Sequence, residues 1–526
     1  MDFNTLDWLL ALLPPLAVLG LMIAFRWDSG RAGLAGWLAA VILAAARFGA
    51  GADALGVAQL EALILVVDVA LIVWGALLLY QTVERAGALA VIADALARLS
   101  TDRLVQALLL GWVFASFLQG IGGFGVPMAI VAPLLIGIGV PRGRAVVIPA
   151  LGHSWAVTFG SLGVPFVVLI ETVDLPGEQL AGPAALLLGA LGYVVALMAA
   201  HALEGRAGIR RVLPFVVVVG TAMGAVQLAL ATNGLWTLGA VGAGLAGFAA
   251  AAGWLRWQRS RRPADAPVAA ADGLQLNQRS RPRPPLALAI AGYVILIALA
   301  LPLRGIEPLR AAVDRVALAV DLPATTTDRG WQMPSEEDEG FGIPAHPGLL
   351  IIYSSAIVFV LYRRRGCYDP GAGRAILAAA TRQTRRVVPG ILLMVALGAT
   401  MARAGMIAVL AEGLGRVMSG ALYAFAAPVI GALGAFVTGS NVSSNAVFGM
   451  PQRSTAELLA LPVLIILGAQ TAAAAVISVM SPAKVAVGAS TVAAAEGEVI
   501  RRLLGYGAIL VALTGVLTWI AVLVFS

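Results

Sequence analysis

Apolar stretches long enough to cross a lipid bilayer recur along the whole chain. A helix of roughly 17 to 25 apolar residues spans the hydrocarbon layer, and six such segments stand out, the fifth being short and extended by its flanks. They are Trp8 to Phe25, Ala62 to Tyr80, Val212 to Thr232, Leu286 to Leu303, Leu349 to Tyr362 and Leu503 to Phe525. With 60% hydrophobic and 12% charged residues, the chain is more apolar than one soluble core requires. We therefore expect an all-α polytopic membrane protein with about 12 to 14 membrane segments, half-passes included.

Several classes of site are disfavoured by simple counts. The single cysteine, Cys367, excludes an intramolecular disulfide and leaves no structural zinc set, so we expect no metal. Lys484 is the only lysine, so no Gly-x4-Gly-Lys-Ser/Thr loop exists and we expect no nucleotide cofactor. The net charge of +7 is explained by arginines in cytoplasmic loops rather than by nucleic-acid binding. Because the start carries Asp2 and Asp7, it does not resemble a secretory signal, and we expect the first span to be retained.

Charge asymmetry predicts the orientation. Seven arginines and two acids lie between Arg256 and Arg283, in a Pro- and Ala-rich run that we interpret as a cytoplasmic linker. Residues 305–346 carry eight acids and three arginines and are expected outside. The expected divisions are N-terminal helices (1–61), a first repeat (62–175), connecting helices (176–257), the linker (258–284), connecting helices with an extracellular loop at 305–346 (285–386), a second repeat (387–495) and a C-terminal helix (496–526).

The two halves contain an internal repeat. Arg85 to Arg98 aligns without gaps to Arg403 to Arg416, with 8 of 14 positions identical. The spans that precede the two copies start on opposite sides, so we predict inverted topology. Both copies are charged and amphipathic, which favours helices at the membrane interface; ordinary tilted spans are the alternative.

Matched breaks interrupt the apolar runs of both repeats. Gly120 to Pro127 is rich in glycine, and its counterpart Gly439 to Asn445 is rich in Ser and Asn; a second pair follows at Gly160 to Pro165 and Ser478 to Pro482. Inverted-repeat transporters bind substrate near the bilayer midplane at such broken helices. The alternative is that Gly and Ser only allow close helix packing. We expect broken helices with a substrate site between them.

At these motifs the sequence resembles the lactate permease family of bacterial transporters. The matching stretches are Phe117 to Pro127, Ala156 to Pro165, Thr438 to Gly449 and Ser481-Pro482, in the same order over nearly the full length. The resemblance implies the fold of the ion transporter superfamily, with a scaffold, two re-entrant hairpins and elevator-type movement. It also implies uptake of lactate, often glycolate too, with protons at the bacterial plasma membrane. A homodimer is a further expectation.

The sequence departs from this family at several positions. Gln119 replaces a usual Glu, Asn441 replaces a usual Asp, His153-Ser154 stands where an Asn is usual, and Ser481-Pro482 is followed by Ala483 and Lys484 rather than Gln. Two carboxylates have thus become amides. We expect Lys484 to bind a carboxylate or to replace a coupling cation; snorkelling to the interface is the alternative. His153 and Asp68 are the candidate proton carriers, although each could serve only in packing.

We therefore predict a secondary transporter of a small monocarboxylate, not an enzyme. Its anion would be held by N–H groups at Gly122 to Gly125 and at Ser443-Ser444, with a substrate hydroxyl donated to Asn441, Asn445 or Gln119. The candidate substrate-binding residues are Gln119, Gly122, Gly123, Phe124, Gly125, His153, Ser154, Ser440, Asn441, Ser443, Ser444, Asn445, Gln470, Thr471, Ser481 and Lys484. Alternatives are another small anion such as glycolate or a sulfonate, with sodium or without a coupling ion, and a non-transport membrane subunit or enzyme.

Overall fold

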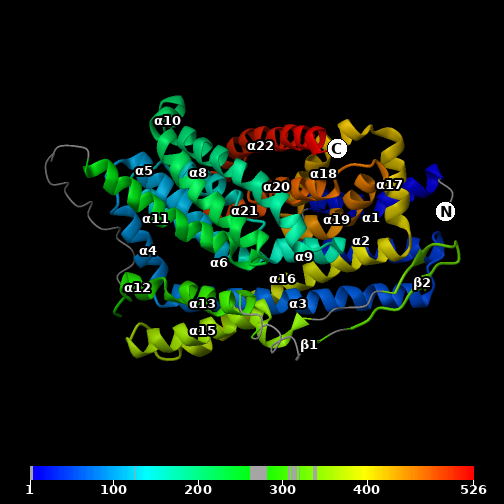
Figure 1. Ribbon diagram of the computed structural model, residues 1–526, viewed down its shortest axis with the longest axis horizontal. Coiled ribbons are helices and arrows are strands. Elements are labelled where there is room, and N and C mark those ends of the chain that lie inside the picture. Colours follow the sequence, from blue (N-terminus) through cyan, green and yellow to red (C-terminus); the bar gives the residue numbers. More distant parts are fainter. Residues whose placement is uncertain are drawn as a thin grey trace.

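Helices form almost the whole of the described structure (Figure 1). The computed structural model describes residues 4–25, 27–123, 125–260, 281–305, 309, 317–318, 320–335 and 341–525. Within these ranges, 10 helices are long and apolar enough to cross a membrane. The predicted all-α polytopic fold is confirmed. Residues 261–280 of the predicted linker lie outside the described part.

The two halves contain helices in the same order. The first set is α3 (Ala52–Arg85), α4 (Ala88–Ala97), a run of α5 (Arg103–Leu108), the π-helix η1 (Leu109–Phe114) and α6 (Ala115–Ile121), then α7 (Val126–Gly137), α8 (Arg142–Ser154), the 3-10 turn η2 (Ser161–Gly163) and α9 (Val164–Val173). The second set is α16 (Ala372–Arg403), α17 (Met406–Val417), α18 (Gly420–Thr438), α19 (Asn441–Leu458), α20 (Val463–Ser478) and α21 (Pro482–Val492). Gly87 and Gly405, which the sequence repeat aligns, both separate a long helix from a short one with left-handed φ angles of 77° and 76°. The repeat therefore has the same backbone break in both copies.

Helix α10 (Gly177–Thr232) contains two antiparallel arms. Gly205 interrupts it with φ 65° and ψ −153°, a conformation that only glycine adopts easily. The arms then pack closely, since a Cβ on Gly189 would lie 4.0 Å from Gly224 Cα and Tyr193 Oη lies 2.8 Å from Thr221 Oγ1. The span predicted at Val212 to Thr232 is the second arm.

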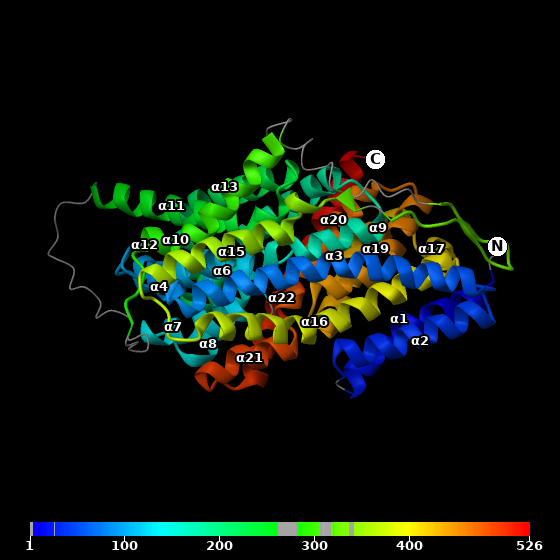
Figure 2. The same ribbon diagram turned by 90° about the horizontal axis from the view of Figure 1, so that it is seen from below.

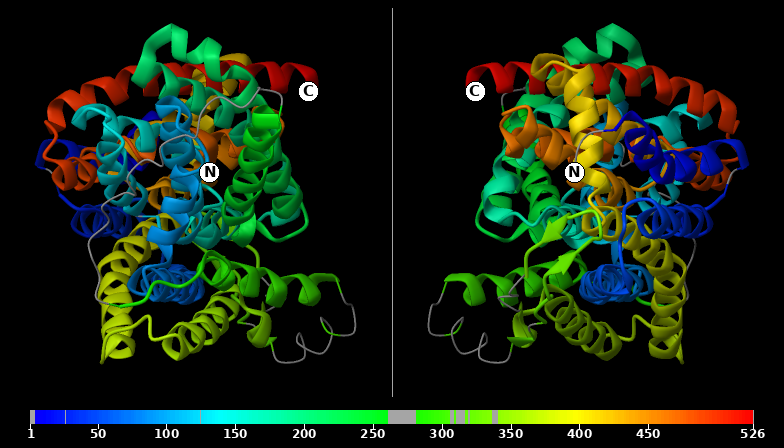
Figure 3. Two further views of the ribbon diagram at one scale, coloured as in Figure 1. Left: turned by 90° about the vertical axis from the view of Figure 1, so that its left-hand side faces the viewer. Right: turned by 90° about the vertical axis from the view of Figure 1, so that its right-hand side faces the viewer.

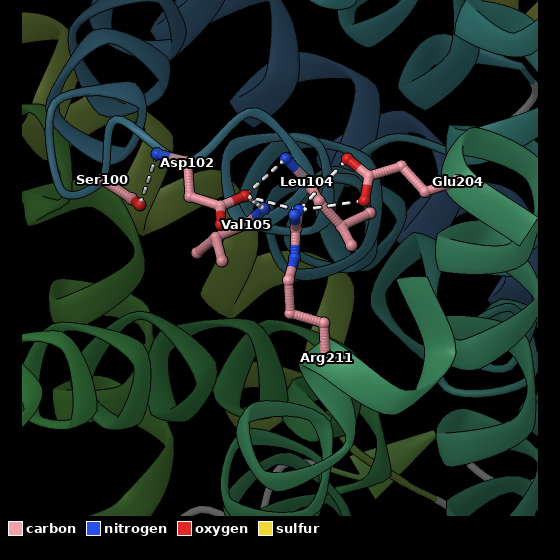
Figure 4. A network of polar contacts seen from close by, with 6 residues as sticks. All are labelled: Ser100, Asp102, Leu104, Val105, Glu204 and Arg211. Atoms are coloured by element: carbon pink, nitrogen blue, oxygen red, sulfur yellow. Dashed lines mark hydrogen bonds and ion pairs between the residues drawn. The ribbon is translucent and has the colours of Figure 1, made fainter. Parts of the chain in front are cut away.

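A polar network fixes this bend against the start of α5 (Figure 4). Arg211 Nη2 donates to Asp102 Oδ1 at 3.0 Å and to Glu204 Oε1 at 3.1 Å. Asp102 Oδ1 also accepts from the N–H groups of Leu104 and Val105, which caps α5. The exposed arginine thus connects the bend of α10 to the first repeat.

The connecting segments differ in part from the prediction. They are η3 (Trp236–Leu238), α11 (Gly239–Ser260), α12 (Leu286–Ala289), α13 (Ala291–Gly305), η4 (Ile343–Ala345) and α15 (Pro347–Arg364). The single span expected at Leu286 to Leu303 is wrong, because Ile290 separates α12 from α13. Four two-residue strands lie in the region expected to be an extracellular loop: β1 (Ala317–Leu318) pairs with β4 (Phe341–Gly342), and β2 (Thr325–Thr326) with β3 (Gln332–Met333).

The β2–β3 hairpin, which belongs to the region predicted outside, lies at one end of the molecule (Figure 1). Asp328, in the turn between β2 and β3, donates from its backbone N–H to Gly49 O at 2.8 Å, just before α3. The N-terminal helix α1 (Thr5–Phe25) and α2 (Ser29–Ala46) lie toward the same end (Figure 2). At the opposite end, α11 finishes and α12 begins (Figure 1).

Helices α3 and α16 form the centre of the packing. They pack against each other, and α3 runs along the longest axis of the molecule, so Figure 3 shows it nearly end-on. Helix α16 also packs on α19, and α19 packs on α9. The C-terminal helix α22 (Glu496–Phe525) covers α18 and α20. This arrangement brings broken helices of both halves together.

Candidate functional site

A cavity of about 180 Å³ lies where the broken helices of the two halves meet. Its first-half lining comes from the end of α6, the break after α8 and the start of α9; its second-half lining comes from α16, the break before α19 and the start of α21. The lining residues are Gln119, Val157, Ser161, Val164, Pro165, Arg386, Val387, Ile391, Thr438, Gly439, Ser440, Asn441, Val442, Ser443 and Lys484. Five of the predicted site residues are among them: Gln119, Ser440, Asn441, Ser443 and Lys484.

The charged side chains of the cavity are both basic. Arg386 projects from the middle of α16, and Lys484 lies in the first turn of α21. Lys484 Nζ has a weak contact with Ser478 Oγ at 3.5 Å. No Asp or Glu is among the lining residues that the structure describes. A cavity with this charge favours an anion.

The second-half break is shorter than predicted. Gly439 has a left-handed φ of 65°, and Ser440 is the N-cap of α19, with its Oγ accepting from Ser443 N at 3.2 Å. Ser444 N donates to Ser440 O at 3.2 Å, so Ser443, Ser444 and Asn445 are helical. The N–H groups of Ser443 and Ser444, predicted to hold the anion, thus both donate to Ser440 in this structure. The first two N–H groups of α19, at Asn441 and Val442, have no partner within the helix.

The first-half break uses its N–H groups in a similar way. Gly122 N donates to Leu118 O at 2.9 Å, and Gly123 N donates to Ser161 Oγ at 3.1 Å. A Cβ on Gly123 would lie 2.2 Å from Ser161 Oγ, so this contact requires glycine. Gly125 has φ 88° and starts α7. The predicted anion contacts at Gly122 and Gly123 are thus occupied by protein groups, and Phe124 lies outside the described residues.

Four buried polar side chains join the halves next to the cavity, and we call them the Thr/Asn cluster. Its members are Thr158, Asn441, Asn445 and Thr471, each at most 2% exposed. Thr471 Oγ1 lies 3.1 Å from Thr158 Oγ1, 3.4 Å from Asn441 Nδ2 and 3.0 Å from Asn445 Nδ2. Asn445 Nδ2 also donates to Pro165 O at 2.9 Å. The cluster therefore connects the break after α8 with α19 and α20.

Gln470 belongs to a separate buried network beside α18. Its Nε2 donates to Ser444 Oγ at 3.1 Å, and its Oε1 accepts from Gln452 Nε2. A Cβ on Gly431 would lie 2.4 Å from Gln470 Oε1, which shows how closely α18 and α20 pack. Ser444 Oγ in turn donates to Gly431 O at 2.8 Å. These contacts give Gln470 and Ser444 a packing role in this conformation.

Three further predicted residues are buried but do not line the cavity. His153 Nδ1 donates to Pro149 O, and Ser154 Oγ donates to Leu151 O at 2.7 Å, so both side chains bond to their own helix. Ser481 is the N-cap residue of α21, and its buried Oγ has no hydrogen-bond partner among the described residues.

Asp68 lies outside the site in a partly buried hydrogen bond with His346. Its Oδ1 accepts from His346 Nε2, while His346 Nδ1 accepts from Gly348 N at 3.1 Å and so caps α15. The His346 side chain is 1% exposed and that of Asp68 is 21% exposed. Asp68 thus connects α3 to α15 rather than facing the cavity.

Arg386 is the charged cavity residue that the sequence analysis does not single out. Residues 363–386 carry seven arginines, a pattern typical of a cytoplasmic orientation signal. The repeat offers one indication: Asp68 and Arg386 lie 318 positions apart, as do Arg85 and Arg403. An ionisable residue therefore lies at equivalent positions of α3 and α16, two candidate membrane spans, where such residues are typical of functional positions.

Comparison with known proteins decides the family. A family model described as L-lactate permease matches residues 7–525. The chain belongs to this family. It is 23% identical to the L-lactate permease of Salmonella typhi over 467 residues, covering 86% of this chain and 84% of the relative. It is also 23% identical to the glycolate permease GlcA of Escherichia coli (strain K12) over 481 residues, covering 87% and 85%. The structure of Neisseria gonorrhoeae MtrF matches with 15% identity and a TM-score of 0.47, over 86% of this chain and 81% of that chain.

Family membership confirms the resemblance and the broad class. This is a multi-pass membrane protein of a permease family, and the matched relatives are transporters rather than enzymes.

Proposed function

We propose that this permease imports lactate or a similar small monocarboxylate across the bacterial plasma membrane by elevator-type alternating access, together with a coupling cation. The observation that carries the proposal is the cavity between the two broken-helix pairs, lined by Arg386 and Lys484 without a described acid. A carboxylate that leaves water needs charged partners to offset its lost hydration. A guanidinium and an ammonium on different helices can supply them.

The rest of the lining suits a short, partly apolar anion. Val157, Val164 and Ile391 provide apolar contacts for a methyl group, and Gln119 and Asn441 provide amides for a hydroxyl group. A small pocket of this kind holds a ligand by a few polar groups within apolar walls. Glycolate is the second candidate, because one relative is named as a glycolate permease.

A coupling cation follows from the charge of the substrate. Moving one negative charge into a cell with a negative interior costs about 2.3 kcal/mol per 100 mV. Resemblance suggests a proton, with His153 or Asp68 as carrier; the alternative is sodium. Neither carrier is among the cavity-lining residues.

Uptake by purified, full-length protein in proteoliposomes tests the proposal. We expect labelled lactate to accumulate when a proton or sodium gradient is imposed, and unlabelled glycolate to compete. Lys484→Gln should abolish uptake while membrane expression stays normal, and Lys484→Arg should retain part of it because the charge remains. Absence of any lactate-dependent signal from a folded protein would overturn the substrate assignment, and normal uptake by Lys484→Gln would remove Lys484 from the site.

A homodimer is the proposed assembly. Chemical cross-linking of the protein in native membranes should give a band at twice the monomer mass, and a monomer at all cross-linker concentrations would contradict it.

A further inference from the structure

We propose that the Thr/Asn cluster binds a sodium ion that is carried together with the anion. This deepens the proposed function, since it identifies the coupling ion and the residues that bind it. The cluster brings together Thr158 from the first half and Asn441, Asn445 and Thr471 from the second, all buried.

Two oxygen atoms of the cluster have nothing to bind. Asn441 Oδ1 and Asn445 Oδ1 are buried and lack a hydrogen-bond partner among the described residues. Buried amide oxygens are normally satisfied, so two such atoms in one cluster require an explanation. Their own amide nitrogens meanwhile donate to threonine hydroxyls, at 3.1 Å to Thr158 Oγ1 and 3.0 Å to Thr471 Oγ1. The amide nitrogens thus face the threonine hydroxyls, in the position from which the amide oxygens could bind a cation.

Rotation of each amide by half a turn converts the cluster into an oxygen cage. The oxygen then takes the place of the nitrogen, beside the threonine hydroxyls and, for Asn445, beside Pro165 O. The contacts that these nitrogens now make span 2.9 to 3.4 Å. A hard cation the size of Ca²⁺ holds oxygens at roughly 2.3 to 2.6 Å, which places neighbouring ligands at right angles roughly 3.3 to 3.7 Å apart. Sodium has a similar radius, so small shifts are sufficient.

The neutral ligands and their surroundings select a monovalent ion. The cluster has amide, hydroxyl and carbonyl oxygens and no carboxylate, whereas Ca²⁺ sites use carboxylates and Mg²⁺ is bound through one or two of them. A co-transported proton would need a titrating base, and Gln119 and Asn441 cannot titrate. In broken-helix transporters, backbone carbonyls at unwound segments coordinate sodium near the substrate.

Asn441 connects the ion to the substrate, because it belongs to the Thr/Asn cluster and also lines the cavity. When the cavity is empty, Arg386 and Lys484 repel a cation nearby. A bound carboxylate offsets that charge, so the anion and the ion should each raise the affinity for the other.

Thermal unfolding of the purified full-length protein tests ion binding without transport. The 11 tryptophans give a fluorescence signal. We expect Tm to rise saturably as sodium chloride replaces choline chloride at constant ionic strength, and lactate to lower the half-saturating sodium concentration. Thr158→Val should raise the half-saturating sodium concentration at least tenfold. Thr158→Ser, which keeps the hydroxyl, should have nearly the wild-type value, and Thr514→Val should leave it unchanged. Thr514 is the matched control, since it is buried in α22 and bonds only to its own helix, at Leu510 O.

Proteoliposome uptake separates this inference from the proposed function. Sodium-dependent lactate uptake that Thr158→Val weakens supports both. Lactate uptake that is the same in sodium and choline, with no effect of sodium on Tm, overturns the sodium site and leaves the substrate assignment standing. Saturable stabilisation by sodium without lactate uptake keeps the site and overturns the substrate.

Discussion

The side-chain amide of Asn441 donates a hydrogen bond to Thr158 Oγ1 at 3.1 Å, across 283 positions of the sequence. Thr158 lies in the break after α8, and Asn441 is the first residue of α19. The two repeats therefore meet through polar side chains at their breaks rather than through apolar packing alone. In the proposed transport cycle, a change between two access states would have to break or rearrange these contacts.

Arg386 should contribute to anion binding. Arg386→Gln removes one of the two charges that line the cavity, and a hydrogen bond to a charged group contributes about 1.5 to 3 kcal/mol. We expect KM for lactate to rise about tenfold to hundredfold with normal expression. Arg385→Gln is the matched control, because the neighbouring arginine carries the same charge but does not line the cavity. Equal effects of the two substitutions would show that only the overall charge of α16 matters.

His153 should not set the pH dependence of uptake. Its Nδ1–H donates to Pro149 O within α8, and the ring is 1% exposed. We expect His153→Asn to lower Tm through lost packing while the pH profile of lactate uptake keeps its shape. The measurement is uptake between pH 5 and 8, the range in which a free histidine titrates, near about 6.5. Loss of the pH dependence in this variant would restore His153 as the proton carrier.

The pair Asp68 and His346 should stabilise the contact between α3 and α15. Removing one partner leaves the other without its hydrogen bond, so Asp68→Ala and His346→Ala should each lower the free energy of unfolding by about 1 to 3 kcal/mol. The double variant should be less destabilised than the sum of the two. Purely additive effects would contradict a direct interaction, and loss of proton-dependent uptake with unchanged stability would identify Asp68 as a carrier instead.

The sequence predicted the repeat because both copies keep the same local requirement. Gly87 and Gly405 each adopt a left-handed conformation that favours glycine, so both copies keep the glycine. Aligning the chain with itself therefore detects the repeat. The extent of the second break was harder to predict. Ser and Asn favour both loops and helix caps, and the bond between Ser440 Oγ and Ser443 N makes Ser443 helical.

Long-range partners could not be predicted in this way. His346 meets Asp68 across 278 positions, from a segment expected to be an acidic extracellular loop. Arg386 follows an arginine-rich segment that is typical of a cytoplasmic boundary. Only the packing of α16 on α19 places it beside the break before α19. In both cases tertiary packing, which the local sequence pattern does not encode, decides what surrounds the side chain.

Gly160 should be required for the close contact between the break after α8 and the end of α6 at Gln119. A Cβ at this position would lie 2.8 Å from Gln119 O and 2.7 Å from Ala156 O, both backbone atoms that no rotamer change can move. Gly160→Ala should therefore displace Gln119 from the cavity wall and cost about 1 to 3 kcal/mol of stability. Gly253→Ala in α11 is the control, because nothing lies within 4 Å of its Cβ position. We expect lactate uptake to fall at least tenfold in the first variant only; uptake that survives with an unchanged KM would mean that Gln119 does not contact the substrate.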